Sequence, residues 1–100
     1  MIKNKIILQN MEDQQMKLVE QGIAAEKLLA ADAFNSTVNQ LVDVAFQSFV
    51  NSKPEETDVR EKSYHHYRAL VDIVGTLQQR VQIKTEIEAS ENADDNNQED

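Results

Sequence analysis

Two adjacent histidines, His65 and His66, are the residues of this 100-residue sequence whose side chains could do acid–base or metal chemistry. Glu61 stands one helical turn before His65, so a carboxylate and an imidazole would share one helix face. Neighbouring helical residues point about 100° apart, however, and two such histidines cannot easily hold one ion. The sequence contains no phosphate-binding glycine loop, nucleophile elbow or paired-carboxylate arrangement. We therefore expect a non-enzymatic protein without a catalytic, metal or cofactor site.

Tyr64 and Tyr67 flank the histidines and stand near Arg60 and Arg68, a combination that could stack on single-stranded bases. Nucleic-acid binding also requires a positive field along the phosphates. The formal net charge is −8, and residues 1–85 hold eleven acids against ten bases, which leaves −1 for that part of the chain. We expect Tyr67 to belong to an apolar core and the protein to make no direct contact with nucleic acid.

The acidity is concentrated at the C-terminal end. Seven of the eighteen Asp and Glu residues lie from Glu86 onward, where there is no Lys or Arg. Residues 88–100 are polar and almost without apolar side chains, so they are predicted to form an acidic tail that is disordered when free. Such a tail keeps a protein soluble, imitates nucleic acid or binds a basic partner, and we favour the first reading.

The composition indicates one all-α domain over residues 1–87. Two glycines, one proline and five aromatic residues argue against a β-rich fold with many turns. Because the chain has no cysteine, disulfides and thiolate zinc sites are excluded. No apolar run approaches the length of a membrane span, and no signal-peptide pattern is present, so we expect neither membrane insertion nor secretion. A chain this short buries a modest core, which favours an oligomer or a bound partner.

The most sharply marked element is a helix over residues 54–85. Pro54 fits the first turn of a helix, with Ser52 or Lys53 as the cap and acidic residues after it. Apolar residues then recur in steps of three and four, the spacing of a coiled-coil-like seam. These seam residues are Tyr67, Leu70, Val74, Leu77 and Val81.

A second helix is predicted over residues 33–51, with Asp32 as its N-cap. The short link to residue 54 makes these two helices an antiparallel hairpin, with Phe34, Leu41, Phe46 and Phe49 packed against Leu70, Val74, Leu77 and Val81. The apolar arc of residues 33–51 is wide enough to touch more than one neighbour. An additional N-terminal helix over residues 5–30 could cover the remainder, although Gly22 could break that helix. Otherwise the uncovered part serves self-association or docking on a larger assembly.

Part of the chain resembles a known group of proteins. The segments Leu28 to Phe34, Lys53 to Thr57 and Tyr67 to Leu70, together with Arg60-Glu61, are similar to small helical-hairpin proteins encoded among the structural and packaging genes of tailed bacteriophages. The resemblance covers about residues 28–77 and contains no catalytic residue to transfer. It implies a virion or assembly component that is located in the particle, or in the host cytoplasm during assembly.

The leading prediction is therefore a non-enzymatic phage structural or assembly protein. It would form homo-oligomers or dock on capsid, portal or internal proteins through apolar helix faces, without cofactor, nucleic acid or membrane. The alternative is a small regulatory adaptor: a packaging-motor accessory, or an inhibitor of a host DNA-binding protein whose acidic tail imitates phosphate. The predicted hairpin seam and candidate interface consist of Phe34, Val38, Leu41, Val42, Phe46, Phe49, Tyr67, Leu70, Val74, Leu77 and Val81.

Overall fold

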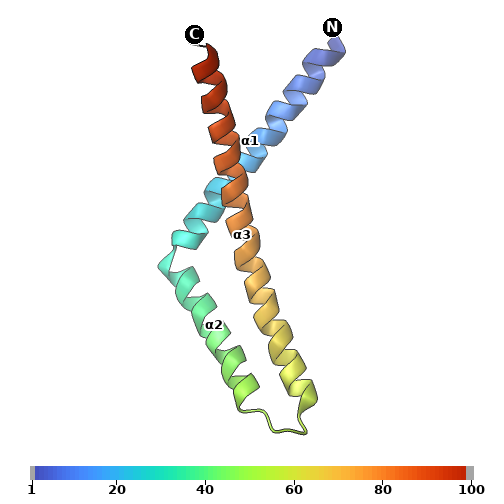
Figure 1. The fold of residues 1–100 in the computed structure, drawn as a ribbon, viewed down its shortest axis with the longest axis vertical. Helices are drawn as coiled ribbons and strands as arrows, with labels where there is room; N and C mark the ends of the chain where they lie inside the picture. Colours follow the sequence, from blue (N-terminus) through green and yellow to red (C-terminus); the bar gives the residue numbers. More distant parts are fainter. Residues whose placement is uncertain (1, 99–100) are drawn as a thin grey trace. The chain divides into compact units, whose positions relative to one another are not determined.

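The computed structural model describes the backbone of residues 2–98 and the side chains of residues 10–93. Over this part the chain consists of three helices, α1 (Ile2–Ala30), α2 (Asp32–Val50) and α3 (Thr57–Gln98), with no strand (Figure 1). The predicted all-α class is confirmed, and a hairpin with one additional helix is compatible with it. Two compact units make up the chain. The crossing unit holds Met1–Lys27 with Leu77–Asp100, and the hairpin unit holds Leu28–Thr76.

A single residue separates α1 from α2. Ala31 has extended backbone angles, φ −77° and ψ 121°, and stands at the N-cap of α2 without a side-chain capping bond. The predicted cap, Asp32, is instead the first residue of the helix, where its carboxylate favours the positive end of the helix dipole. Asn35 Nδ2 donates to the Leu29 carbonyl at 2.8 Å and so satisfies one of the last acceptors of α1.

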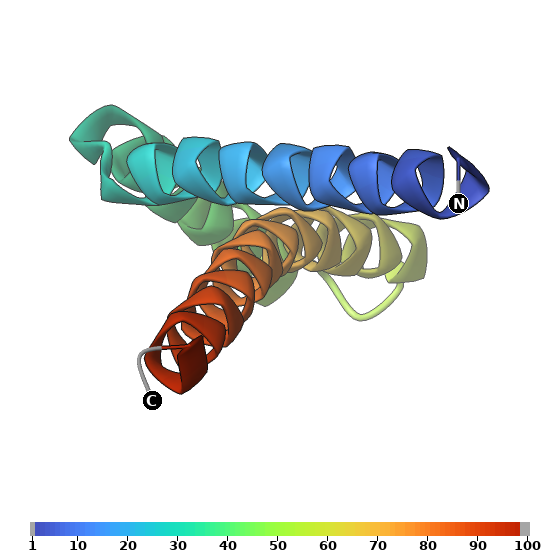
Figure 2. The same ribbon diagram turned by 90° about the horizontal axis from the view of Figure 1, so that it is seen from above.

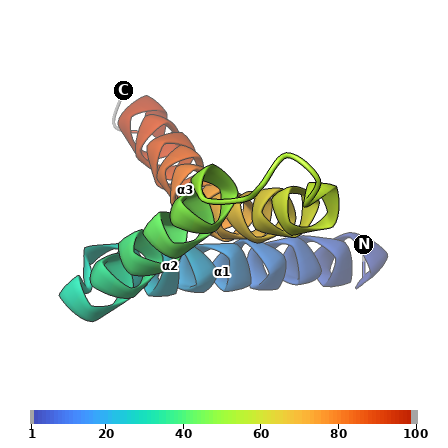
Figure 3. The same cartoon turned by 90° about the horizontal axis from the view of Figure 1, so that it is seen from below.

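The hairpin unit pairs α2 with the first half of α3, and the two run antiparallel on either side of the turn (Figure 1); Figure 3 shows the same turn from below. The sequence predicts that the third helix starts at residue 54, but the structure has a turn there. Lys53 N donates to Glu56 Oε1 at 2.8 Å, and Glu56 N donates to the Lys53 carbonyl at 2.9 Å. These two bonds close a turn that contains Pro54, so helical backbone begins only at Thr57.

Arg60 holds this turn from inside α3. Its Nη1 donates to the Lys53 carbonyl at 2.6 Å and to Ser52 Oγ at 3.3 Å, and its Nη2 donates to the Pro54 carbonyl at 2.9 Å. Charged donors make stronger hydrogen bonds than neutral ones. The guanidinium, considered above for base stacking, is therefore engaged by the chain's own carbonyls.

The C-terminal half of α3 extends beyond the predicted end at residue 85. Residues 88–98 are helical, where the sequence predicts a tail that is disordered when free; Glu99 and Asp100 lie outside the described residues. Two contacts one turn apart support the continuation: Gln82 to Glu86 at 3.2 Å and Lys84 to Glu88 at 3.4 Å. No glycine or proline follows Gly75 to interrupt the helix.

In the crossing unit, α1 and the C-terminal half of α3 cross and then diverge toward the start of α1 and the end of α3 (Figures 1 and 2). Gly22 is buried at the crossing, inside an uninterrupted helix. A Cβ atom at Gly22 would collide with the Cβ of Lys84 and lie 2.8 Å from the Arg80 carbonyl oxygen. Gly22 thus lies directly against α3, where a larger residue has no room, and the possible helix break suggested by the sequence is not present.

Candidate interaction surface

Small side chains form the centre of the hairpin seam. Ala45 of α2 and Ser63 of α3 are the residues of this unit that are buried among the described side chains. Ser63 Oγ donates to the Val59 carbonyl at 2.9 Å and lies 3.0 Å from Ser48 Oγ on the opposite helix. Short side chains at these positions let the two helices approach closely. The hydroxyl pair satisfies the polar groups that this approach encloses.

Close approach at a narrow seam leaves the large side chains beside it. Phe34, Val38 and Val42 of α2 are half-buried, as are Leu70 and Val74 of α3. The other predicted seam residues of this unit are exposed instead of packed in the seam: Leu41, Phe46, Phe49 and Tyr67.

The last two predicted seam residues, Leu77 and Val81, belong to the crossing unit. Leu77 is buried there and Val81 is half-buried. The sequence prediction assigned them to the hairpin because their spacing continues that of Leu70 and Val74 along one face of α3.

One flank of the seam is an open hollow of about 510 Å³, which we call the aromatic groove. Four of the chain's five aromatic residues line it. Phe46 is 58% exposed, Phe49 49%, Tyr64 57% and Tyr67 46%. The remaining lining residues are Asn39, Val42, Asp43, Ala45 and Ser63. Exposed aromatic side chains that gather in one hollow are typical of protein interaction sites.

The opposite flank holds a second open hollow of about 510 Å³, the aliphatic groove. Its lining contains His66 and no Phe or Tyr. The other residues that line it are Leu41, Val44, Ala45, Ser48, Ser63, Ala69 and Leu70. The hairpin therefore presents two chemically different faces, one aromatic and one aliphatic.

The residues considered for acid–base or metal chemistry are divided between two open hollows. Arg60, Glu61, Tyr64 and His65 line one beside Phe49, and His66 lines the aliphatic groove. His65 and His66 are both exposed, and the His65 ring meets Tyr64 edge to face with centroids 5.7 Å apart. Within the described part of the chain, no three His, Asp or Glu side chains are grouped so that they could hold a metal ion. None of the helices described there has an apolar stretch long enough to span a membrane.

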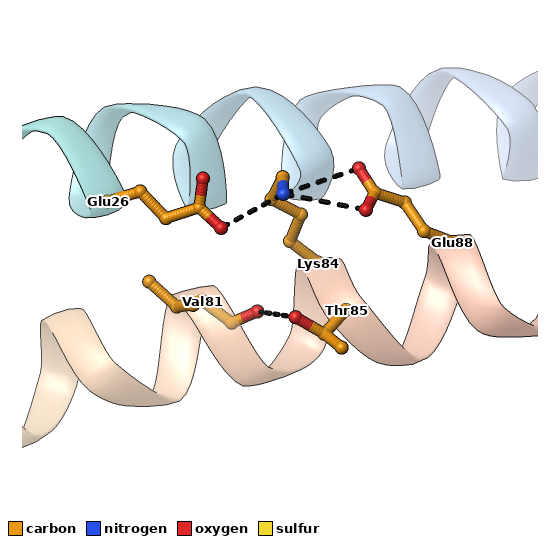
Figure 4. A network of polar contacts seen from close by, with 5 residues as sticks. All are labelled: Glu26, Val81, Lys84, Thr85 and Glu88. Atoms are coloured by element: carbon orange, nitrogen blue, oxygen red, sulfur yellow. Dashed lines mark hydrogen bonds and ion pairs between the residues drawn. The ribbon is translucent and has the colours of Figure 1, made fainter.

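In the crossing unit an ion pair joins the two helices, whereas in the hairpin unit a pair of hydroxyl groups does so. Lys84 Nζ of α3 lies 2.9 Å from Glu26 Oε1 of α1 and 3.4 Å from Glu88 one turn further along α3 (Figure 4). The hydrogen bond to Glu26, reinforced by the negative charges of Glu26 and Glu88 and partly opposed by desolvation, raises the pKa of Lys84 above its usual 10.5. This network joins α1 to α3 within the crossing unit.

The candidate interface predicted from the sequence leaves out Ala45, Ser48 and Ser63, because it was chosen by the size of the apolar side chains. A better signal was available: Ala45 and Ser48 are small residues three apart on one face of a helix that is otherwise rich in Phe, Val and Leu. Small residues repeated on one face indicate where backbones approach, which in a short antiparallel hairpin means the neighbouring helix. No protein family, curated protein or solved structure gives a significant match to the chain. The resemblance to phage hairpin proteins therefore stays a prediction.

Proposed function

We propose that this protein is a non-enzymatic interaction module that works by covering its apolar helix faces, either in a homo-oligomer or on a larger protein. The observation that carries the proposal is the lack of a core of its own in the hairpin unit. Ala45 and Ser63 are its buried residues among the side chains described, whereas nine of its large apolar or aromatic side chains between Leu41 and Ile73 are exposed. Apolar surface on this scale is rare on a monomer that has no partner.

The mechanism is burial of that surface. Removing a large apolar side chain from water contributes about 1.5–3 kcal/mol when burial is complete. The exposed side chains of the hairpin are roughly half covered, so a partner supplies the remaining part of this free energy. The stability of the folded hairpin therefore increases with the concentration of its partner.

The light-scattering mass of the full chain at increasing concentration tests this proposal. A mass above that of the monomer supports it, as does a defined complex with a co-expressed larger protein encoded beside it. A chain that stays monomeric and forms no such complex contradicts it.

The biological setting that we propose is the particle or assembly pathway of a tailed bacteriophage, with capsid, portal or internal proteins as the larger partners. This assignment is supported by the resemblance over residues 28–77. Quantitative mass spectrometry of purified particles tests it. Many copies per particle are expected, and absence from both particles and assembly intermediates would rule it out.

A further inference from the structure

We propose that the aromatic groove is the self-association face of this protein and that its occupant is the same groove of a second copy. The two hairpins would form a two-fold symmetric, antiparallel four-helix bundle. This inference rests on the proposed function and names the partner for one of the two hairpin faces. Three observations carry it: the area left open, the register of the rim charges and the difference between the two grooves.

The open aromatic area matches what a small dimer needs. An aromatic side chain has about 150–250 Å² of surface, so four that are about half exposed leave roughly 400 Å² open on each copy. Two copies facing each other would cover roughly 800 Å² from these rings alone. Val50 and Val71, which are also exposed on the two helices, bring the total close to the roughly 1,000 Å² expected of a specific interface.

The charges at the rim are complementary under two-fold symmetry. The contact between Ser48 and Ser63 sets the register of the antiparallel helices. Asp43 stands five residues before Ser48, and Arg68 stands five residues after Ser63, so they lie at the same height along the hairpin. Asp43 lines the groove on the α2 side, and Arg68 follows Tyr67 toward the polar side of α3.

A two-fold axis parallel to the helices places α2 of one copy over α3 of the other without changing height, so each α2 gains an antiparallel neighbour. Asp43 of one copy then faces Arg68 of the second copy, and the symmetry makes this pair twice. The Arg68 guanidinium is available for it. Its contact with Asp72, at 3.6 Å, joins two side chains that are each about 60% exposed, and such surface pairs are weak.

The aromatic groove suits this role better than the aliphatic groove does. Phe and Tyr rings supply large contact area at low conformational entropy cost, and they dominate the energetics of interfaces. Docking of four rings from each copy also places the Tyr hydroxyl groups near the polar rim, where water can still reach them.

The test compares two truncations of α2 in the full chain. Phe46 and Val44 are both 58% exposed, but Phe46 lines the aromatic groove and Val44 lines the aliphatic groove. Sedimentation equilibrium from about 1 µM to 1 mM measures the dimer dissociation constant. Phe46→Ala is expected to raise it roughly 100-fold or more, because each dimer loses two anchoring rings, and Val44→Ala is expected to change it less than about threefold. Because both side chains are exposed, circular dichroism should show helical content unchanged in each variant.

Cysteine pairing then tests the predicted geometry. The chain has no cysteine, so Asp43→Cys and Arg68→Cys each introduce one thiol. An oxidised mixture of the two variants should form a mixed disulfide several-fold more readily than a mixture of Arg68→Cys with Val44→Cys, because Val44 lies at nearly the same height as Asp43 but lines the aliphatic groove. Equal cross-linking in the two mixtures would overturn the proposed arrangement.

The remaining outcomes distinguish a failure of this inference from a failure of the proposed function. An oligomer that Val44→Ala dissociates and Phe46→Ala does not would overturn the inference and leave the proposed function intact. A monomer over the whole concentration range that binds a larger co-expressed protein would do the same. A monomer that binds no such protein would overturn both.

Discussion

Both units of the chain bring two helices into close contact, but one uses neutral polar groups at the contact and the other uses charged groups. In the hairpin unit, α2 and α3 approach along a seam of small residues, with a neutral hydroxyl pair between Ser48 and Ser63. In the crossing unit, α1 and α3 are in contact at Gly22, with Ala25 buried one turn further along α1, beside the charged contact of Lys84 with Glu26. Among the side chains described, the hairpin unit buries only the small residues Ala45 and Ser63, whereas the crossing unit also buries the large side chain of Leu77. This difference explains why the aromatic residues of the hairpin are left beside the contact and available to a partner.

The largest effect is expected from a substitution at Gly22, where α1 contacts α3. Gly22→Ala should destabilise the protein by about 2 kcal/mol, because the new Cβ would collide with Lys84 Cβ and the Arg80 carbonyl, and the helices must separate to admit it. Gly75→Ala is the matched control. A Cβ at Gly75 meets nothing within 4 Å, so alanine should stabilise α3 by about 1 kcal/mol through helix propensity alone. Urea unfolding followed by circular dichroism measures both changes in the free energy of unfolding. If both substitutions changed it in the same direction, the close contact at Gly22 would be refuted.

A larger side chain in the hairpin seam should also lower the free energy of unfolding, but by less than the substitution at Gly22. Ala45→Leu places three additional carbon atoms in the closest part of the hairpin and is expected to cost about 1–2 kcal/mol, because the open grooves on both flanks allow partial relaxation. Ala33→Leu lies at an exposed position of the same helix and should change the free energy of unfolding by less than about 0.5 kcal/mol. If Ala45→Leu were neutral, small residues would not be a requirement of the seam.

The smallest effect concerns the charged contact and depends on pH. The pKa of Lys84 is raised above 10.5 in the folded protein, chiefly by its hydrogen bond to Glu26. A cation whose folded pKa is raised contributes its full stabilisation below the unfolded pKa and loses it as the pH rises through the folded pKa. The free energy of unfolding should therefore contain the full contribution of Lys84 at neutral pH, without a pH dependence from this group, and fall above about pH 10.5. Lys84→Met should remove that part of the alkaline loss. An alkaline profile that Lys84→Met leaves unchanged would contradict this.

The sequence predicted the existence of the three helices more accurately than their ends. Apolar spacing of three and four residues is a strong helix signal, and the turn near Pro54 was clear. The start of α3 was three residues early because proline in a first helical turn and proline in the preceding tight turn have the same sequence signature. The two hydrogen bonds between Lys53 and Glu56 distinguish the two cases, and they are seen only in the structure.

The arrangement at the seam could not be predicted from hydrophobicity. Burial favours the largest apolar side chains when each helix is considered alone, so Phe46 and Phe49 were assigned to the hairpin seam. The helices approach more closely than those rings permit, because Ala45 and Ser63 allow it. The pattern did indicate that α2 has more apolar surface than one neighbouring helix can cover. In the structure Phe46, Phe49 and Val50 remain exposed.

The placement of the tyrosines has a practical consequence. The chain contains two tyrosines and no tryptophan, and both tyrosines line the aromatic groove. Near-ultraviolet absorbance and intrinsic fluorescence of the unmodified protein consequently report almost entirely on that single surface. Whatever comes to occupy it should alter the spectrum without any label being attached.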